Sequence, residues 1–152
     1  MKKKFYSVYF DAAAFEKARA HFKSAAQNGV EAMGLLLGEV CRFKGKKFVM
    51  VVDYVTAGND ASAVSVRFGD RAFPELANAL WGAAGKTVVG WMHSHPSYGC
   101  YLSARDVAAQ EGFFNEPFHV AFVLDPVRND CKAFRVRNGK QVEVSFAVVE
   151  EK

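Results

Sequence analysis

The chain has 152 residues, enough for one domain of ordinary size and too few for two hydrophobic cores, so a single domain over residues 1–152 is predicted. Hydrophobic residues make up 51% of the sequence, 14 residues are phenylalanine and 24% are charged, a composition that excludes disordered and fibrous proteins. The net charge of +4 is too small to identify an acidic or nucleic-acid partner by itself.

The first half of the chain predicts a strand, a helix and a pair of buried strands. Aromatic and β-branched residues alternate with smaller ones over Lys4–Phe10, as in a strand. Asp11 is a suitable N-cap for a helix over Ala12–Gln27, in which apolar residues recur at helical spacing. Ala32–Arg42 and Phe48–Val55 indicate two buried strands, and the lysine-rich turn between them predicts a hairpin.

The second half begins with a polar segment and continues with alternating strands and helices. Ala57–Gly69 is small and polar and predicts a loop, with a short strand at Ala63–Phe68, and Asp70–Ala84 predicts a helix. A strand, a loop, a helix and three strands are expected to follow: Thr87–His95, Pro96–Leu102, Ser103–Phe114, His119–Leu124, Cys131–Arg137 and Val142–Val149. Interspersed strands and helices predict an α/β or α+β fold with a mixed sheet.

Basic clusters, cysteines and apolar runs bear on partners and location. Lys2–Lys4 is favoured as a solvated terminus over a nucleic-acid arm, and neither it nor Lys44–Lys47 has the interleaved aromatic residues that stack on bases. The three cysteines, Cys41, Cys100 and Cys131, form no CxxC pair. No apolar run reaches the roughly 18 residues that a membrane span needs, and the N-terminus lacks the long apolar core of a secretory signal. We therefore expect a soluble cytoplasmic protein with reduced thiols and without nucleic-acid or membrane partners.

The most informative stretch runs from His93 to Asp106. Residues two apart on a strand face the same side, so His93 and His95 can direct both imidazoles to one point. Pro96 ends the strand there, and Asp106 is expected in the first turn of the next helix. Two imidazoles and one carboxylate form a three-ligand zinc site with an open fourth position, which is typical of catalytic zinc.

Each part of this pattern also has a structural explanation. A single His-x-His on a strand is weak evidence for a metal site. Ser103 and Asp106 have the spacing of a capping box, and a carboxylate in the first turn is stabilised by the helix dipole. Cys100 lies near His95 in sequence, but a cysteine nucleophile needs a free imidazole as its base, so Cys100 is interpreted as a loop-packing residue.

Taken together, these residues resemble the JAMM (MPN+) metallopeptidase family. Its pattern is a distant glutamate, His-x-His, seven residues beginning with proline, and Ser-x-x-Asp. His93–Pro96 and Ser103–Asp106 match this spacing without a gap, and Glu31 within Val30–Gly38 resembles the distant glutamate. The similarity includes Gly99–Ser103 and Val123–Pro126, covers about residues 5–137, and is greatest to the branch of the proteasome-lid deubiquitinase and the signalosome isopeptidase.

The resemblance implies a fold and a mechanism. The fold would be a single MPN domain, a curved mixed sheet flanked by helices and related to the cytidine deaminases. One Zn²⁺ per chain would be held by His93, His95 and Asp106. Glu31 would be the general base and then the general acid, and Ser103 would donate a hydrogen bond to the tetrahedral oxyanion.

The resemblance also implies an activity, for which alternatives remain open. The expected reaction is hydrolysis of isopeptide bonds between the C-terminal tail of ubiquitin or a ubiquitin-like protein and a lysine amine. The tail would add a strand to the Ala57–Phe68 segment if that segment forms a hairpin. Alternatives are a peptidase that processes a small ubiquitin-like sulfur-carrier protein, a non-catalytic MPN scaffold, and a metal phosphoesterase or nuclease, although two-metal sites need more ligands. The short chain favours a minimal prokaryotic-type member, and its oligomeric state is not indicated.

Overall fold

The computed structural model describes residues 4–56 and 86–150, so the loop, short strand and helix expected between Ala57 and Ala84 lie outside the described residues. The described part forms an eight-stranded sheet in the order β7-β6-β5-β4-β2-β3-β1-β8. Its elements are β1 (Val8–Asp11), α1 (Ala12–Gln27), β2 (Met33–Phe43), β3 (Lys46–Thr56), β4 (Thr87–Ser94), α4 (Ala104–Phe113), β5 (Val120–Asp125), β6 (Asp130–Arg137), β7 (Lys140–Val144) and β8 (Phe146–Val149).

The sheet is mixed, as the sequence predicted. β1 pairs in parallel with β3 and β8, and β4 pairs in parallel with β5, whereas the other neighbours are antiparallel. β4 and β5 approach each other so closely that a Cβ added at Gly90 would lie 1.9 Å from the carbonyl oxygen of Val120. Glycine is therefore required at this point of the strand that leads to the two histidines.

Helix α1 has the bounds that the sequence predicted. A side-chain oxygen of Asp11 accepts a hydrogen bond from the backbone N–H of Ala14 at 3.2 Å, and this cap satisfies an otherwise unpaired amide. The helix ends at Asn28, and Gly29 follows with φ +68°, a left-handed conformation that glycine adopts without strain. Phe22 and the alanines of the inner stripe are buried against the sheet.

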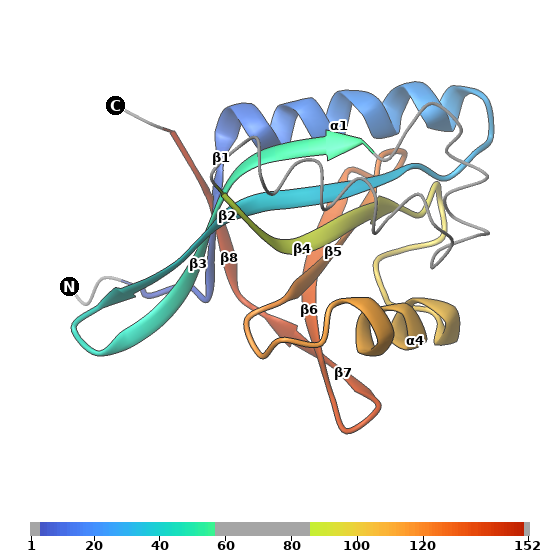
Figure 1. Ribbon diagram of the computed structural model, residues 1–152. Helices are drawn as coiled ribbons and strands as arrows, with labels where there is room; N and C mark the ends of the chain where they lie inside the picture. Colours follow the sequence, from blue (N-terminus) through green and yellow to red (C-terminus); the bar gives the residue numbers. More distant parts are fainter. Residues whose placement is uncertain (1–3, 57–85, 151–152) are drawn as a thin grey trace.

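The two helices of the described segments cover opposite faces of the sheet, as Figure 1 shows. The buried residues form two clusters accordingly. One joins α1 to residues such as Leu36, Met92 and Phe122, and the other joins Trp91 and Val123 to the segments that flank α4. Within the part of the chain that the structure describes, no helix is long and apolar enough to cross a membrane.

Three expectations about the strands were wrong in detail. Val142–Val149 is two strands, because the chain leaves β6 after Val144 and pairs with β1 from Phe146. The first strand begins at Val8 rather than Lys4. β2 is buried on both faces only as far as Gly38, since its outer part, Glu39–Phe43, pairs with β3 and extends past the end of β4.

Candidate active site

The predicted ligands meet where the end of β4 faces the start of α4. His93 and His95 are 4% and 3% exposed, and their Nε2 atoms lie 3.1 Å apart. Oδ2 of Asp106 lies 3.0 Å from Nε2 of His93 and 3.5 Å from Nε2 of His95. The structure therefore brings all three residues into one cluster, whose potential ligand atoms lie within 4.8 Å of one another.

The spacing of these three atoms suits a tetrahedral ion. Zinc–nitrogen and zinc–oxygen bonds of about 2.0–2.2 Å place neighbouring ligand atoms of a tetrahedron about 3.3–3.5 Å apart. The observed separations of 3.0, 3.1 and 3.5 Å lie within this range or just below it. Two neutral imidazoles with one carboxylate are also the donor set of a catalytic zinc, so these residues fit the ion that the resemblance implies.

Asp106 caps helix α4 and also faces the two histidines, so it has both of the roles that its sequence pattern allowed. The hydroxyl oxygen of Ser103 accepts the backbone N–H of Asp106 at 3.1 Å, and Oδ2 of Asp106 accepts the backbone N–H of Ser103 at 2.9 Å. This capping box starts α4, and the same Oδ2 atom faces the two histidines. Burial raises the pKa of Asp106, but the two facing imidazoles and the backbone hydrogen bond from Ser103 outweigh burial and hold it well below its ordinary value, so the carboxylate remains ionised.

A second contact aligns α4 with β4. Nε1 of Trp91 donates a hydrogen bond of 2.6 Å to Oε1 of Gln110, which is buried. Gln110 lies one helical turn after Asp106, and Trp91 lies two residues before His93, so both spacings are roughly 6–7 Å. The helix therefore touches the strand at two matching points, and the Trp91 ring stacks on the His93 ring with centroids 4.5 Å apart.

The loop after β4 surrounds His95. Nδ1 of His95 lies 3.1 Å from the carbonyl oxygen of Gly99. Because a carbonyl oxygen can only accept a hydrogen bond, the proton of the neutral ring is on Nδ1, and Nε2 faces the cluster with its lone pair. The ring of Tyr98 stacks on His95 with centroids 4.6 Å apart, and that of Tyr101 packs edge-on at 5.0 Å. The loop thus fixes both the tautomer and the orientation of this imidazole.

Asp125, at the end of β5, holds this loop in place from inside the protein. Oδ1 accepts the backbone N–H groups of Ser97, Val127 and Arg128 at 2.9–3.0 Å, and Oδ2 accepts that of Gly99 at 3.0 Å. The side chain is fully buried. Burial raises the pKa of Asp125, but the four hydrogen bonds outweigh it and hold the pKa below its ordinary value.

The side chain of Glu31 is on the same face of the sheet as the two histidines. Met33 pairs with His93 across β2 and β4, and residues opposite each other on antiparallel strands share a face. Ser94 extends this pairing, because its N–H donates to the carbonyl of Ala32 at 3.0 Å and its Oγ accepts the N–H of Ala32 at 2.9 Å. Glu31, two positions before Met33, therefore points to the His93 side, whereas Ser94 has a structural role in joining the two strands.

A direct contact connects Glu31 to the cluster. The hydroxyl of Tyr98 donates a hydrogen bond to Oε2 of Glu31 while the Tyr98 ring covers His95. Burial and this hydrogen bond to an anion both raise the pKa of Tyr98, so the hydroxyl keeps its proton and acts as a donor. Cys100, by contrast, packs against the core and has its pKa raised by burial, unlike a reactive thiol.

The sequence analysis missed several residues that build the site. Asp125 was noted only within Val123–Pro126, a segment that resembles the family, and Tyr98 only within the predicted loop Pro96–Leu102. Gln141 of β7 was not singled out, although its side-chain amide makes two hydrogen bonds of 2.8 Å with the backbone of Leu102. An acidic residue at the end of a buried strand was the one available signal for Asp125, whereas the contacts of Tyr98 and Gln141 depend on the folded chain.

A family profile described as JAB1/Mov34/MPN/PAD-1 ubiquitin protease matches residues 3–116. The chain belongs to this family. The matched range contains Glu31, the three clustered residues and Ser103, so all the site residues predicted from the sequence lie within it. The fold of an MPN domain, expected from the resemblance, is thereby confirmed.

Individual proteins show how far the similarity extends. The chain is 35% identical over 125 residues to the 26S proteasome regulatory subunit rpn11 of Schizosaccharomyces pombe, covering 80% of this chain and 39% of that protein. It is 35% identical over 126 residues to the ubiquitin carboxyl-terminal hydrolase RPN11 of Saccharomyces cerevisiae, a match that covers 81% of this chain and 40% of that protein. The solution structure of a protein from Desulfitobacterium hafniense has a TM-score of 0.69 at 22% identity, covers 95% of this chain and 94% of that one, and shows the same fold.

The chain thus spans about two fifths of the length of the curated relatives that it matches. The family and the fold of the MPN domain are shown.

Proposed function

We propose that this MPN domain is a zinc-dependent isopeptidase that releases ubiquitin or a ubiquitin-like protein from lysine amines by cleavage at the modifier's C-terminal tail. The observation that carries the proposal is the convergence of His93, His95 and Asp106, with Glu31 on the same face. The match to a ubiquitin protease profile and 35% identity to a protein named as a ubiquitin carboxyl-terminal hydrolase support the choice of modifier.

In the proposed mechanism His93, His95 and Asp106 hold the ion. When bound, zinc supplies Lewis acidity, which lowers the pKa of a coordinated water to about 7 and polarises a carbonyl oxygen. Glu31 accepts the proton of the attacking water and delivers it to the leaving lysine amine, as one carboxylate can act first as base and then as acid.

Ser103 and the surrounding loop supply orientation. The hydroxyl oxygen of Ser103 accepts the N–H of Asp106, which leaves its proton free to donate to an oxyanion. The Tyr98 hydroxyl holds the Glu31 carboxylate on the side of His95. Each proton transfer is therefore assigned to a side chain whose position is fixed by a hydrogen bond.

Metal dependence provides the first test. Purified protein is expected to contain one zinc per chain by elemental analysis and to cleave tail-linked ubiquitin or ubiquitin-like conjugates. A chelator should remove both the metal and the activity, and added zinc should restore both. His95→Ala should lose the metal because it removes one of three ligands, whereas His21→Ala on α1, outside the cluster, should retain it.

Three results would contradict the proposal. Zinc-loaded protein that cleaves none of the conjugates would favour a non-catalytic scaffold, and cleavage only at the free C-terminus of a small sulfur-carrier protein would favour the processing peptidase. Hydrolysis of phosphodiesters would point to a different class of metal enzyme.

Tyr98→Phe is expected to lower kcat about tenfold with little change in KM or zinc content. The substitution keeps the ring stacked on His95 but removes the hydroxyl that donates to Glu31, and a hydrogen bond to a charged group contributes about 1.5 kcal/mol. Steady-state kinetics on a fluorogenic tail-linked substrate measure the effect. Tyr101→Phe is the matched control, since its ring also contacts His95, and an equal loss in both variants would rule out the role of the Tyr98 hydroxyl.

A further inference from the structure

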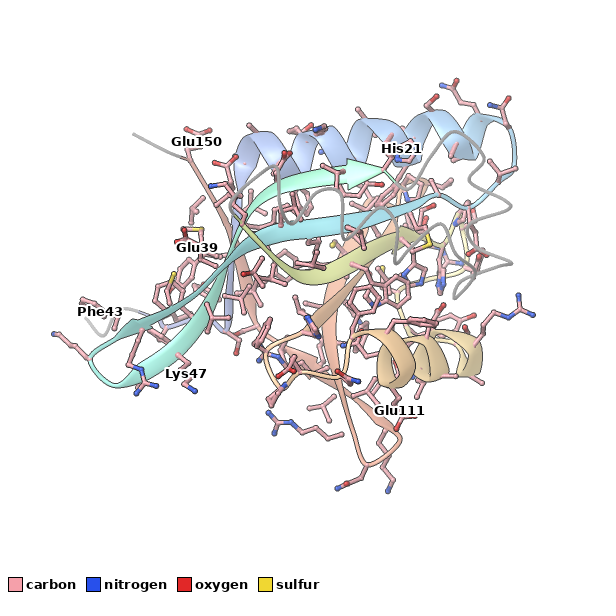
Figure 2. The ribbon with its side chains drawn as sticks, in the orientation of Figure 1. His21, Glu39, Phe43, Lys47, Glu111 and Glu150 are labelled. Atoms are coloured by element: carbon pink, nitrogen blue, oxygen red, sulfur yellow. The ribbon has the colours of Figure 1, made fainter. Side chains whose placement is uncertain are left out.

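A groove lies at the far end of the β2–β3 hairpin from the candidate active site. It has a volume of about 580 Å³ and is formed by the segment before β1, by Tyr9 and by the outer parts of β2 and β3. In Figure 1 this hairpin extends beyond the body of the sheet, and Figure 2 shows Phe43 and Lys47 near its tip. Met33, at the other end of β2, pairs with His93, so roughly 30 Å of extended chain separates the groove from the cluster.

Aromatic side chains form the floor of the groove. Phe48 packs edge-to-face against Phe5 and Tyr9, with ring centroids 5.8 and 5.3 Å apart. Phe5 and Phe43 are 37% and 58% exposed, although both are large apolar residues. Contiguous exposed apolar surface of this kind commonly marks a binding site. The sequence did not predict the patch, because Phe5 and Tyr9 reach the lysines only in the folded chain.

The rim of the groove is positively charged. Lys4, Arg42, Lys44 and Lys46 line it, and no carboxylate is present among its described lining residues. The ion pairs found between described residues involve none of these four side chains. Clustered cations repel one another, so the surface gains stability when a partner supplies negative charge.

We propose that this groove docks an extended acidic peptide segment of another protein, with aromatic or aliphatic side chains at alternate positions. Alternate side chains of an extended segment point in opposite directions, so apolar ones fill the floor while carboxylates reach the cationic rim. The ammonium group of Lys46 lies 5.2 Å from the centre of the Phe5 ring. The ammonium group of Lys44 lies 5.5 Å from the centre of the Phe43 ring. These ring faces are already covered by cations, which argues against base stacking by nucleic acid.

The probe for this proposal is a short fluorescein-labelled peptide in which glutamate alternates with phenylalanine or leucine, titrated with the full chain by fluorescence anisotropy. Binding is expected, and it should weaken as salt rises because the rim contacts are electrostatic. Lys44→Glu combined with Lys46→Glu should raise Kd about tenfold or more, as should Phe43→Ser, which removes the apolar contact without a change of charge.

Matched controls separate the groove from general charge effects. Lys23→Glu combined with Lys140→Glu changes the net charge equally on exposed positions of α1 and β7 and should leave Kd unchanged. A peptide with lysine in place of glutamate should not bind. Zinc content and conjugate cleavage should be the same in all variants, so this proposal can fail while the proposed function stands.

Several outcomes would overturn the proposal. One is the absence of peptide binding, and another is equal binding by the groove variants and the control. Binding of anionic lipid vesicles or single-stranded oligonucleotides in preference to the peptide would assign the groove to another partner. Concentration-dependent self-association that Phe43→Ser abolishes would show that a second copy of the chain occupies it.

Discussion

Glu31→Gln is expected to lower kcat by roughly 10³-fold or more while one zinc per chain stays bound. The substitution is nearly isosteric, and the amide oxygen can still accept the Tyr98 hydroxyl, so the local structure should persist. A glutamine cannot take a proton from water or return one to an amine, and each such transfer contributes typically 10²–10⁴-fold. Single-turnover cleavage of a tail-linked conjugate together with elemental analysis measures both quantities on the same sample.

Glu39→Gln is the matched control for this experiment. Glu39 lies on the exposed outer part of β2, the strand that follows Glu31, and is away from the cluster, so its neutralisation should leave both kcat and zinc content unchanged. If Glu31→Gln retains activity within about tenfold of the wild type, another group must be the base. If it loses zinc, Glu31 is a ligand and its assignment as the base is wrong.

Asp125→Asn is expected to lower the free energy of unfolding by about 3 kcal/mol, because a buried carboxylate that accepts several backbone amides is replaced by a group that can accept only part of them. The amide oxygen can still occupy the Oδ1 position, but the amide NH₂ then faces the N–H of Gly99, and two donors repel. For a domain of this size the Tm should fall by roughly 6–12 °C, measured by circular dichroism.

The same substitution is expected to weaken zinc binding, although Asp125 is not a ligand. Gly99 carries the carbonyl that accepts Nδ1–H of His95, so a displaced Gly99 leaves this imidazole without its fixed tautomer. Loss of such an outer partner typically lowers metal affinity 10- to 100-fold. Competition with a chromogenic chelator measures the affinity, and an unchanged value would show that the loop orients His95 without Asp125.

The stability difference between the wild type and Asp125→Asn should depend on pH in a defined direction. The folded state holds the pKa of Asp125 below the ordinary value of about 4, so the unfolded chain binds a proton more readily. The stabilisation is therefore complete above about pH 5 and is lost as the pH falls below 4 toward the folded pKa.

Local spacing explains which parts of the site the sequence could predict. The strand period of two places His93 and His95 on one face, and the capping pattern of Ser103 and Asp106 places a carboxylate in the first helical turn. Both inferences need only nearby residues. Helix α1 was predicted to its exact bounds for the same reason, since its cap and apolar stripe lie within the segment itself.

Contacts between distant segments explain what the sequence could not predict. Asp125 and Ser97 are far apart along the chain and meet only because β5 lies beside β4 in the sheet. The division of Val142–Val149 into two strands has a similar cause, because the local pattern is continuous and the break arises from a change of pairing partner. The aromatic floor beside the hairpin lysines likewise depends on how β1 packs against β3.

One oxygen atom, Oδ2 of Asp106, both starts a helix and faces two imidazoles, and this restricts how the domain can be re-engineered. A longer acid at this position would have to satisfy two fixed geometries at once, so the aspartate cannot be exchanged on its own. Ala104 and Arg105 lie in the same turn, are exposed and have no part in the cap. A library that varies the start of α4 should therefore randomise these two positions and leave their neighbours untouched.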